Sequence, residues 1–430
     1  MTTGFERDPD EFTRGARAVV VYPDLGGSSR DADARLEETA GLAAAIGVEV
    51  VERVPLRIRA PKPGTLIGSG QVEALAETVR DRELTLAVFD ASLTPVQQRN
   101  LETGLGCKVI DRTGLILEIF GERARTAEGR LQVELAHLDY QAGRLVRSWT
   151  HLERQRGGFG FLGGPGETQI EADRRLIRDR MARLRRELDS VSRTRTLHRD
   201  RRQRAPWPVI ALVGYTNAGK STLFNRLTGS DVMAENLLFA TLDPTLRQIS
   251  LPGIDKAILS DTVGFVSELP TQLVAAFKAT LEEVVSADLL IHVRDIAHPD
   301  SEAQKDDVEA VLADIGVAET TPRFEAWNKI DLLDGERRED LLAESARRED
   351  VMPVSAVTGE GVDALIHAVA GRLTEGHRRY TLHLDPADGA AAAWLHQHGE
   401  VIEQGMDGDQ AVYEVRMAPR DYERFLTRST

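Results

Sequence analysis

Residues 209–222 read Val-Ile-Ala-Leu-Val-Gly-Tyr-Thr-Asn-Ala-Gly-Lys-Ser-Thr, an apolar run followed by a glycine-rich loop that ends in Lys220 and Ser221. The apolar run predicts a strand, and residues 221–227 predict the helix that follows the loop. Backbone N–H groups of such a loop face a β-phosphate, its lysine reaches the β and γ oxygens, and its serine ligates Mg²⁺. An ordinary glycine turn is the alternative, but the flanking strand and helix favour a phosphate site. The expected contacts are Gly214, Tyr215, Thr216, Asn217, Ala218, Gly219, Lys220, Ser221 and Thr222.

A second motif, Asn328-Lys329-Ile330-Asp331, follows the apolar segment 324–327 and indicates which base is bound. The carboxylate of Asp331 can accept hydrogen bonds from guanine N1–H and the 2-amino group, a pair that adenine lacks. A polar group left unpaired by the wrong base can discriminate by roughly 10⁴-fold. The sequence therefore favours GTP over ATP. Residues Ser355, Ala356 and Val357 are expected to back the base through their N–H groups.

Two further motifs lie between these, in the order typical of a GTPase. Asp261-Thr262-Val263-Gly264 follows the predicted strand 257–260, where a carboxylate can hold Mg²⁺ through water and the Gly264 N–H can sense the γ-phosphate. The segment 239–245 offers the Thr241 hydroxyl as a second Mg²⁺ ligand. Expected nucleotide contacts in that segment are Phe239, Ala240, Thr241, Leu242 and Asp243. The expected Mg²⁺ ligands are Ser221, Thr241 and Asp261, and the expected catalytic residues are Lys220, Thr241, Gly264 and Asn217.

The residue after Gly264 is Phe265, where many small GTPases have a glutamine that orients the attacking water. A phenylalanine cannot do this, so we expect slow hydrolysis that a partner or an ion accelerates. Asn217 suggests a potassium ion beside the β- and γ-phosphates as one such aid. The alternative is that Asn217 only stabilises the loop. Equal rates in potassium and sodium buffers would reject the potassium hypothesis.

The composition indicates a multidomain globular protein. The chain has 430 residues, of which 41% are hydrophobic, enough for two to four domains with cores of their own. Its one cysteine, Cys107, excludes an intrachain disulfide and a cysteine-based metal site. Residues 1–12 lack the apolar core of a signal peptide, and no run approaches the roughly 18 apolar residues of a membrane span. We therefore expect a cytoplasmic location.

Charge is distributed unevenly along the chain. The formal net charge is −15, yet residues 174–204 carry 13 arginines and 4 acidic residues. That stretch indicates either a nucleic-acid contact or a solvated helix face, and the neighbouring sequence favours the first.

Residues 16–125 alternate short apolar strands with helical stretches, which predicts a small α/β domain with a mostly parallel sheet. The loop 64–71 opens a predicted helix there. It lacks the Lys-Ser ending of a phosphate loop and the third glycine of a dinucleotide fingerprint. A structural turn is therefore favoured, with an anion site as the alternative.

Residues 126–195 predict an antiparallel helical hairpin, because apolar side chains recur every three or four positions in two stretches. Those positions are Leu131, Leu135, Leu138, Ala142 and Leu145, then Ile177, Met181, Leu184, Leu188 and Val191. The connection between them is rich in glycine and arginine and carries two phenylalanines that can stack on bases. A plain surface turn is the alternative. The expected RNA contacts are Arg154, Arg156, Gly157, Gly158, Phe159, Gly160, Arg174 and Arg175.

A polar, arginine-rich linker leads to a P-loop GTPase domain predicted over 207–375. Residues 379–428 then predict a small α+β module with the order strand, helix, strand, strand, helix. The expected fold class is therefore α/β: a small parallel α/β domain with a helical hairpin, a P-loop domain, and an α+β module.

Four segments carry a family resemblance: Arg123–Thr126, Gln132–Ala136, Gly163–Thr168 and Phe239–Thr245. With these motifs in this order, the chain resembles the HflX family of ribosome-associated GTPases. The resemblance implies GTP and Mg²⁺ as ligands and the large (50S) ribosomal subunit as the partner that stimulates hydrolysis. We also expect a monomer. It also implies a role in dissociating or rescuing stalled ribosomes, with residues 157–166 facing ribosomal RNA. Two departures from the family pattern are Gly68–Gln71, where members often have lysines, and Arg294, a position usually apolar or small.

Other functions stay open at this point. An RNA-remodelling enzyme driven by ATP or GTP would show ATP hydrolysis that survives Lys220→Ala. A non-catalytic scaffold would leave GTP intact with every partner present. A ribosome-assembly GTPase would use the same chemistry, and the sequence does not separate it from a dissociation factor.

Overall fold

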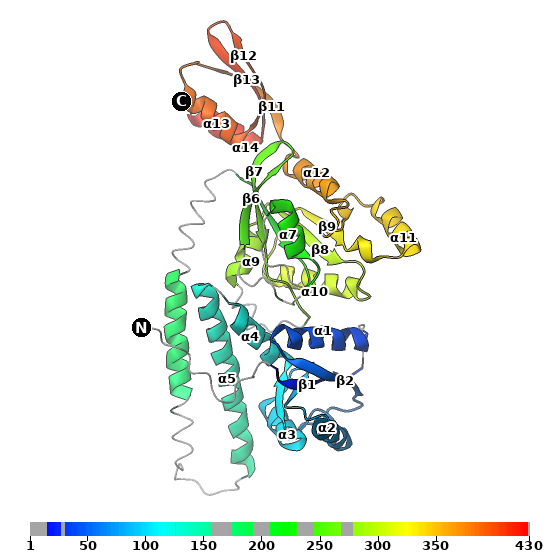
Figure 1. Cartoon of the computed structure of the whole chain (residues 1–430). Coiled ribbons are helices and arrows are strands. Elements are labelled where there is room, and N and C mark those ends of the chain that lie inside the picture. The colour runs from blue at the N-terminus through cyan, green and yellow to red at the C-terminus, as the bar shows by residue number, and fades with distance from the viewer. Residues whose placement is uncertain are drawn as a thin grey trace.

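The computed structural model describes residues 15–26, 31–124, 126–155, 172, 174–191, 207–229, 239, 245–267 and 278–428. These residues form three sheets, one in each of three successive units, and a pair of long helices beside them (Figure 1). The α/β fold class expected from the sequence is confirmed. Within the described ranges no helix combines the length and the apolar character that a membrane crossing requires.

The N-terminal unit, residues 15–124, is built on a fully parallel sheet in the order β2-β1-β3-β4. Helices α1 and α4 lie on the side that faces the central unit, and α2 and α3 lie on the opposite side (Figure 1). The elements are β1 Arg17–Asp24, α1 Ala32–Ala45, β2 Glu49–Arg57, α2 Ser69–Asp81, β3 Leu86–Phe89, α3 Pro95–Leu105, β4 Lys108–Asp111 and α4 Arg112–Arg123.

The loop before α2 is closed by its own side chains. The Gly68 N–H donates to Gln71 Oε1 at 2.9 Å, so the first turn of the helix is capped from within. Leu66 has a φ of 63°, which marks a tight turn at this point. These contacts favour the structural-turn interpretation over the anion site.

The helical hairpin consists of α5, Ala127–Gln155, and a second helix over residues 174–191. The two run side by side (Figure 1), and Arg180 Nε donates to Glu134 Oε1 at 2.7 Å between them. Met181 and Leu184 are buried, as the periodic pattern predicts. Val133 is also buried, although it lies outside the predicted stripe, because a second face of α5 packs against the N-terminal unit.

The central unit, residues 207–373, has a six-stranded sheet in the order β10-β9-β8-β5-β7-β6. Its strands are parallel except for β6, an antiparallel edge strand that the sequence patterns did not predict. The elements are β5 Val209–Val213, α7 Lys220–Thr228, β6 Thr245–Leu251, β7 Ile254–Asp261, α9 Lys278–Val285, β8 Leu289–Asp295, α10 Ser301–Asp314, β9 Arg323–Asn328, the 3₁₀ helix η1 Ile330–Leu332, α11 Gly335–Ser345, β10 Val351–Pro353 and α12 Val362–Leu373.

The C-terminal unit is an antiparallel α+β structure with sheet order β11-β13-β12. Leu395, Val415 and Met417 form its fully buried centre, and the Tyr380 and Tyr422 rings stack at 3.8 Å. Its elements are β11 Arg378–Leu384, α13 Gly389–His398, β12 Glu400–Asp407, β13 Gln410–Met417 and α14 Pro419–Arg428.

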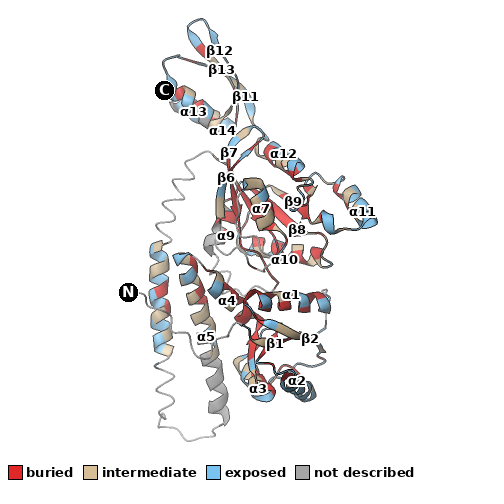
Figure 2. Ribbon diagram, in the orientation of Figure 1, coloured by how far each residue is buried: buried red, intermediate tan, exposed pale blue. Residues whose placement is uncertain are grey.

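The N-terminal and central units share one hydrophobic core. Residues of α4, such as Leu117 and Phe120, belong to the same buried cluster as Val213, Phe265 and Leu290 of the central unit. In Figure 2 the buried positions continue from the N-terminal sheet through α1 and α4 into the central sheet. The two units are therefore docked through apolar packing as well as through polar contacts.

Candidate nucleotide-binding site

The phosphate loop connects the C-terminal end of β5 to α7 and depends on two glycines. Gly214 has a φ of +151°, and a Cβ there would lie 2.2 Å from the Val293 carbonyl oxygen. Gly219 has a φ of +95°, and a Cβ there would lie 2.2 Å from Asn328 Nδ2. Since no side chain fits at either position, these glycines set the path of the loop. Asn217, also left-handed with a φ of 60°, is exposed at its tip.

Lys220 begins α7 with its amine turned back under the loop. Its Nζ donates to the carbonyl oxygens of Gly214 at 3.1 Å and Tyr215 at 2.8 Å, and the residue is only 5% exposed. Burial lowers the pKa of Lys220 to about 8, although the Asp261 carboxylate opposes this shift. A buried cation at the start of a helix suits an anionic ligand.

The next residue of α7 pairs with the end of β7. Ser221 Oγ donates to Asp261 Oδ2 at 2.7 Å. A hydroxyl and a carboxylate are hard oxygen donors of the kind that Mg²⁺ accepts together with water and phosphate oxygens. In the part of the chain that the structure describes, no cluster of three or more His, Cys, Asp or Glu residues offers an all-protein metal cage. The donor set therefore fits Mg²⁺ bound jointly with a nucleotide. Nearby, Thr216 Oγ1 is buried and has no hydrogen-bond partner among the described residues.

The segment after Asp261 lies directly on the phosphate loop. A Cβ on Gly264 would lie 2.8 Å from Thr216 Cγ2 and 3.1 Å from Lys220 Nζ, so only glycine allows this approach. The Phe265 N–H donates to the Gly214 carbonyl at 3.1 Å, and its carbonyl accepts from the Thr216 N–H at 2.7 Å. Phe265 is 1% exposed, so its ring belongs to the core rather than to the phosphate site.

Two predicted contacts in this segment turn away from the loop. Thr262 Oγ1 donates to the Leu212 carbonyl at 2.6 Å and so ties β7 to β5. Val263 is 3% exposed and packs in the core. The structure does not bring either side chain to the phosphate loop.

Asn328, at the end of β9, joins the phosphate loop to the predicted base-binding loop. Its Nδ2 donates to the Ala218 carbonyl at 2.8 Å, and its Oδ1 accepts from the Ala356 N–H at 2.9 Å. Lys329 follows with a φ of 68° and pairs with Asp295 at 2.7 Å. Asp331 is exposed on η1.

The base-binding loop itself is held by two contacts. Ser355 is fully buried, and its Oγ accepts from the Thr358 N–H at 3.1 Å. Arg226, on α7, donates from Nε to the Ala356 carbonyl at 2.6 Å and from a terminal nitrogen to the Val357 carbonyl. Sequence reasoning missed Arg226, because no motif marks a residue that supports the loop from 130 positions away.

Phe239 lies in the core that the N-terminal and central units share. It is 2% exposed and meets Phe120 of α4 edge to face, with ring centroids 4.6 Å apart. The remaining residues predicted in that segment, Ala240, Thr241, Leu242 and Asp243, lie outside the described residues. So do the side chain of Arg154 and the predicted RNA contacts Arg156, Gly157, Gly158, Phe159 and Gly160. Arg174 and Arg175 are described, at the start of the second hairpin helix.

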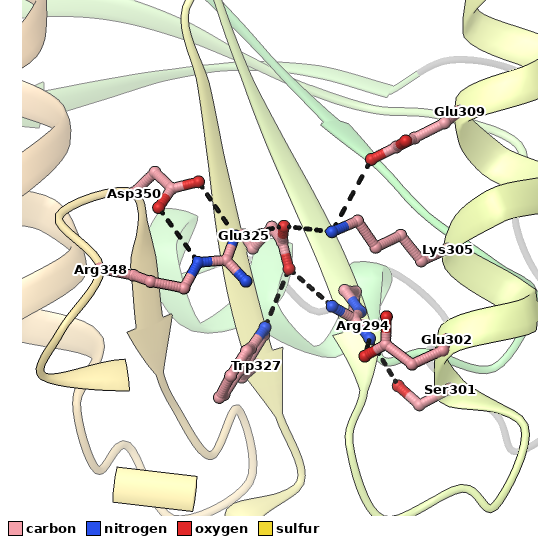
Figure 3. A network of polar contacts seen from close by, with 9 residues as sticks. All are labelled: Arg294, Ser301, Glu302, Lys305, Glu309, Glu325, Trp327, Arg348 and Asp350. Carbon is pink, nitrogen blue, oxygen red and sulfur yellow. Dashed lines mark hydrogen bonds and ion pairs between the residues drawn. The ribbon is translucent and has the colours of Figure 1, made fainter. Parts of the chain in front are cut away.

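An ion network joins β8, β9 and α10 to the residues just before β10 (Figure 3). Glu325 of β9 pairs with Arg294 at 2.6 Å and with Lys305 and Arg348 at 2.8 Å each. Arg294 also pairs with Glu302 of α10. The unusual arginine noted in the sequence is therefore an internal partner of β9 and α10.

Four family models match successive parts of the chain. Their descriptions are GTP-binding GTPase N-terminal over residues 33–121 and GTP-binding GTPase Middle Region over residues 123–202. A 50S ribosome-binding GTPase model matches residues 209–329, and an HflX C-terminal domain model matches residues 340–428.

The chain is also similar to whole curated proteins. It is 51% identical to the GTPase HflX of Magnetococcus marinus over 404 residues, which cover 94% of this chain and 93% of that protein. It is 44% identical to the GTPase HflX of Escherichia coli, with 96% of each chain covered. A crystal structure of SsGBP with GDP is 25% identical and covers 84% of this chain and 99% of that one, with a TM-score of 0.48.

Proposed function

The chain belongs to the HflX family of GTPases, and on that premise we propose that it is a cytoplasmic, GTP-gated factor of the large (50S) ribosomal subunit. The protein is a GTPase that binds GTP with Mg²⁺. Our proposal adds that it acts as a monomer, hydrolyses GTP slowly alone, and dissociates or rescues stalled ribosomes when it is bound to them.

In this proposal different residues of the site bind different parts of the nucleotide. The phosphate loop from Gly214 to Thr222 surrounds the phosphates through its N–H groups, and Lys220 neutralises the β and γ oxygens. Asp331 reads the guanine edge, while Asn328 holds the base-binding loop against the phosphate loop. The Mg²⁺ ion would be held by Ser221 and Asp261, with Thr241 as the predicted third protein ligand, and would supply charge neutralisation at the phosphates.

One observation carries the claim that hydrolysis needs a partner. Phe265 follows the γ-phosphate-sensing Gly264, and its ring is buried while both of its backbone groups bond to the phosphate loop. No side chain at this position reaches the attacking water. The orienting group must therefore come from elsewhere, and a large subunit bound to the protein is the source we propose.

A potassium ion is the second aid that we propose. Asn217 is exposed on the phosphate loop in a left-handed conformation, so its side chain is not buried in the core. Hydrolysis in potassium buffer should exceed hydrolysis in sodium buffer, and Asn217→Ala should remove the difference.

The helical hairpin supplies the ribosomal contact in this proposal. Arg174 and Arg175 stand at the start of its second helix, next to the glycine-rich connection. Binding through arginines and phosphates should weaken steeply as salt rises, because counterions are released on binding. A flat salt dependence would indicate protein contacts instead.

The decisive experiment is the GTP hydrolysis rate of the purified protein in potassium buffer, with and without isolated 50S subunits. We expect stimulation by at least about tenfold, and Lys220→Ala should abolish it. The variant with Arg154, Arg156, Arg174 and Arg175 replaced by alanine should bind GTP normally and lose the stimulation. Stimulation that is absent in the unaltered protein would reject the ribosomal role. ATP hydrolysis that survives Lys220→Ala would indicate an RNA-remodelling enzyme instead.

A further inference from the structure

Four side chains close a ring between the N-terminal unit and the nucleotide site. Tyr215 of the phosphate loop donates its hydroxyl to Glu38 Oε2 of α1 at 2.9 Å. The same hydroxyl accepts from the Ser267 N–H at 2.8 Å. Arg112, the first residue of α4, donates to Ser267 Oγ at 2.8 Å and to the Glu38 carboxylate. We call Glu38, Arg112, Tyr215 and Ser267 the interdomain ring.

The ring is buried and its charges are balanced. The Arg112 side chain is 3% exposed and that of Glu38 is 12% exposed. Asp90 of the N-terminal unit adds a second carboxylate at 2.6 Å from Arg112, and Arg35 adds a second guanidinium at 2.9 Å from Asp90. Burial opposes ionisation, but the carboxylates of Glu38 and Asp90 raise the pKa of Arg112 above its ordinary value, so the guanidinium stays charged. Hydrogen bonds between charged groups in such a place are strong and geometrically specific.

The ring acts on the segment that follows Asp261. Ser267 is three residues beyond Gly264, and the stretch between them is already bonded to the phosphate loop through Phe265. Gly264 consequently lies so close to Lys220 that an added Cβ would be 3.1 Å from its amine. The ring therefore fixes Ser267, at one end of a short segment. The other end of that segment, Gly264, is the residue proposed to contact the nucleotide.

Helix α4 also contacts Phe239, the first residue of the segment predicted to carry the second Mg²⁺ ligand. Phe120 packs edge to face on Phe239, a residue whose φ of 59° is unfavourable for a bulky side chain and needs support from its surroundings. Arg112 and Phe120 belong to one rigid helix, so both segments expected to respond to the γ-phosphate rest on the same element of the N-terminal unit.

We propose that the interdomain ring holds Gly264 beside Lys220 in advance of binding, which makes Glu38 and Arg112 positioning residues for the γ-phosphate of GTP. The inference rests on the roles of Gly264 and Lys220 proposed above. Preorganised groups bind more tightly because the cost of ordering them is already met. GDP lacks the γ-phosphate and gains nothing from Gly264. The ring therefore increases the affinity for GTP relative to GDP.

The test compares Glu38→Ala with Glu37→Ala. Both remove one carboxylate from α1, but Glu37 is exposed and outside the ring, and in the first variant Arg112 keeps its contact with Asp90, which Arg35 shares. The affinities for a non-hydrolysable GTP analogue and for GDP are measured at equilibrium with Mg²⁺. We expect Glu38→Ala to lower the analogue affinity about tenfold and to leave the GDP affinity within about twofold. Glu37→Ala should change neither.

If the ring only stabilises the fold, Glu38→Ala lowers the affinities for the GTP analogue and for GDP together, or it changes neither. Either result overturns the proposal. Should Glu38→Ala fail to fold, Ser267→Ala breaks the same ring by removing the hydroxyl to which Arg112 donates, and it should give the same selective loss. Lys220→Ala provides the separate test of the underlying site, since it should lose GTP and GDP alike. Nucleotide binding that survives Lys220→Ala would reject the proposed site, whereas an unselective Glu38→Ala variant rejects only the ring.

Discussion

Two buried arginines of this protein, Arg112 and Arg294, make different kinds of contact. Arg112 belongs to the interdomain ring and joins two units, whereas Arg294 belongs to the ion network of Figure 3 and joins elements of one unit. Their side chains are almost equally buried, at 3% and 2% exposure. Each is paired with one carboxylate at 2.6 Å and also with a second one. Burial and charge pairing alone therefore do not separate a functional contact from a structural one.

The difference lies in what each arginine holds. Arg294 and Glu325 sit on the neighbouring strands β8 and β9, which the sheet already fixes. Burial opposes ionisation of Glu325, but hydrogen bonds from Lys305, Trp327, Arg294 and Arg348 hold its pKa well below the usual range. Arg112 instead holds Ser267, on a segment that the central sheet does not include. A charged contact to a segment outside the sheet can change function without changing the fold.

The largest expected effect is on stability, from Glu325→Ala. The variant removes the common partner of three cations and leaves Arg294 buried, which should cost about 3 kcal/mol. We would measure the urea midpoint of the central unit, with Glu319→Ala, an exposed position on the same unit, as the control. The ratio of GTP to GDP affinity should not change. A changed ratio would show that the network of Figure 3 also positions the nucleotide. The contacts of Arg294 would then not be purely structural.

The sequence predicted neither the ion network nor the interdomain ring, but its motifs predicted local features of the site. Motifs identified the phosphate loop and the end of β9 because the order of residue types is itself the signal. The helix α3, Pro95–Leu105, has local signals at both of its ends, since Thr94 caps the start and Gly106 takes the left-handed conformation at the end. Local chemistry of this kind is readable without a structure.

Contacts between distant segments were not readable. Arg112 meets Ser267 across 155 positions and Tyr215 meets Glu38 across 177, and no periodicity or spacing indicates either pair. The edge strand β6 was missed because its mixture of buried and exposed residues gives no continuous apolar run. Thr262 and Val263 belong to a motif, but the motif does not tell which of its side chains face the core.

A smaller effect is expected at Asp111, the residue before Arg112, because its carboxylate is bonded to helix α5 of the hairpin. Asp111 accepts from Tyr140 at 2.7 Å and from Arg144 at 2.8 Å, both on α5. Burial and the Asp111 carboxylate raise the pKa of Tyr140 far above its ordinary value, so its hydroxyl stays a donor. Tyr140→Phe should lower the stability of the N-terminal unit by about 1 kcal/mol.

The GTP and GDP affinities of Tyr140→Phe test whether the hairpin also acts on the nucleotide site. The ring itself stays intact in this variant, so the ratio of GTP to GDP affinity should stay within about twofold of the original. Stability is followed by thermal unfolding, and Tyr380→Phe in the C-terminal unit, which keeps its stacking on Tyr422, is the control. A selective loss of GTP affinity in Tyr140→Phe would mean that the hairpin, and not only α4, sets the position of Gly264.

The smallest expected effect concerns Lys220, a third buried cation that differs from both arginines. Its described hydrogen bonds go to backbone carbonyls, and the Asp261 carboxylate only partly offsets the effect of burial on its charge. Burial lowers the pKa of Lys220 to about 8. Below that pH the ammonium is already present for the phosphates, and above it the free site must first take up a proton. The affinity for GDP should therefore fall about fourfold between pH 7 and pH 8.5. Circular dichroism over the same range excludes unfolding as the cause. An affinity that stays level would mean that Lys220 remains charged throughout and that its burial resembles that of Arg112 and Arg294.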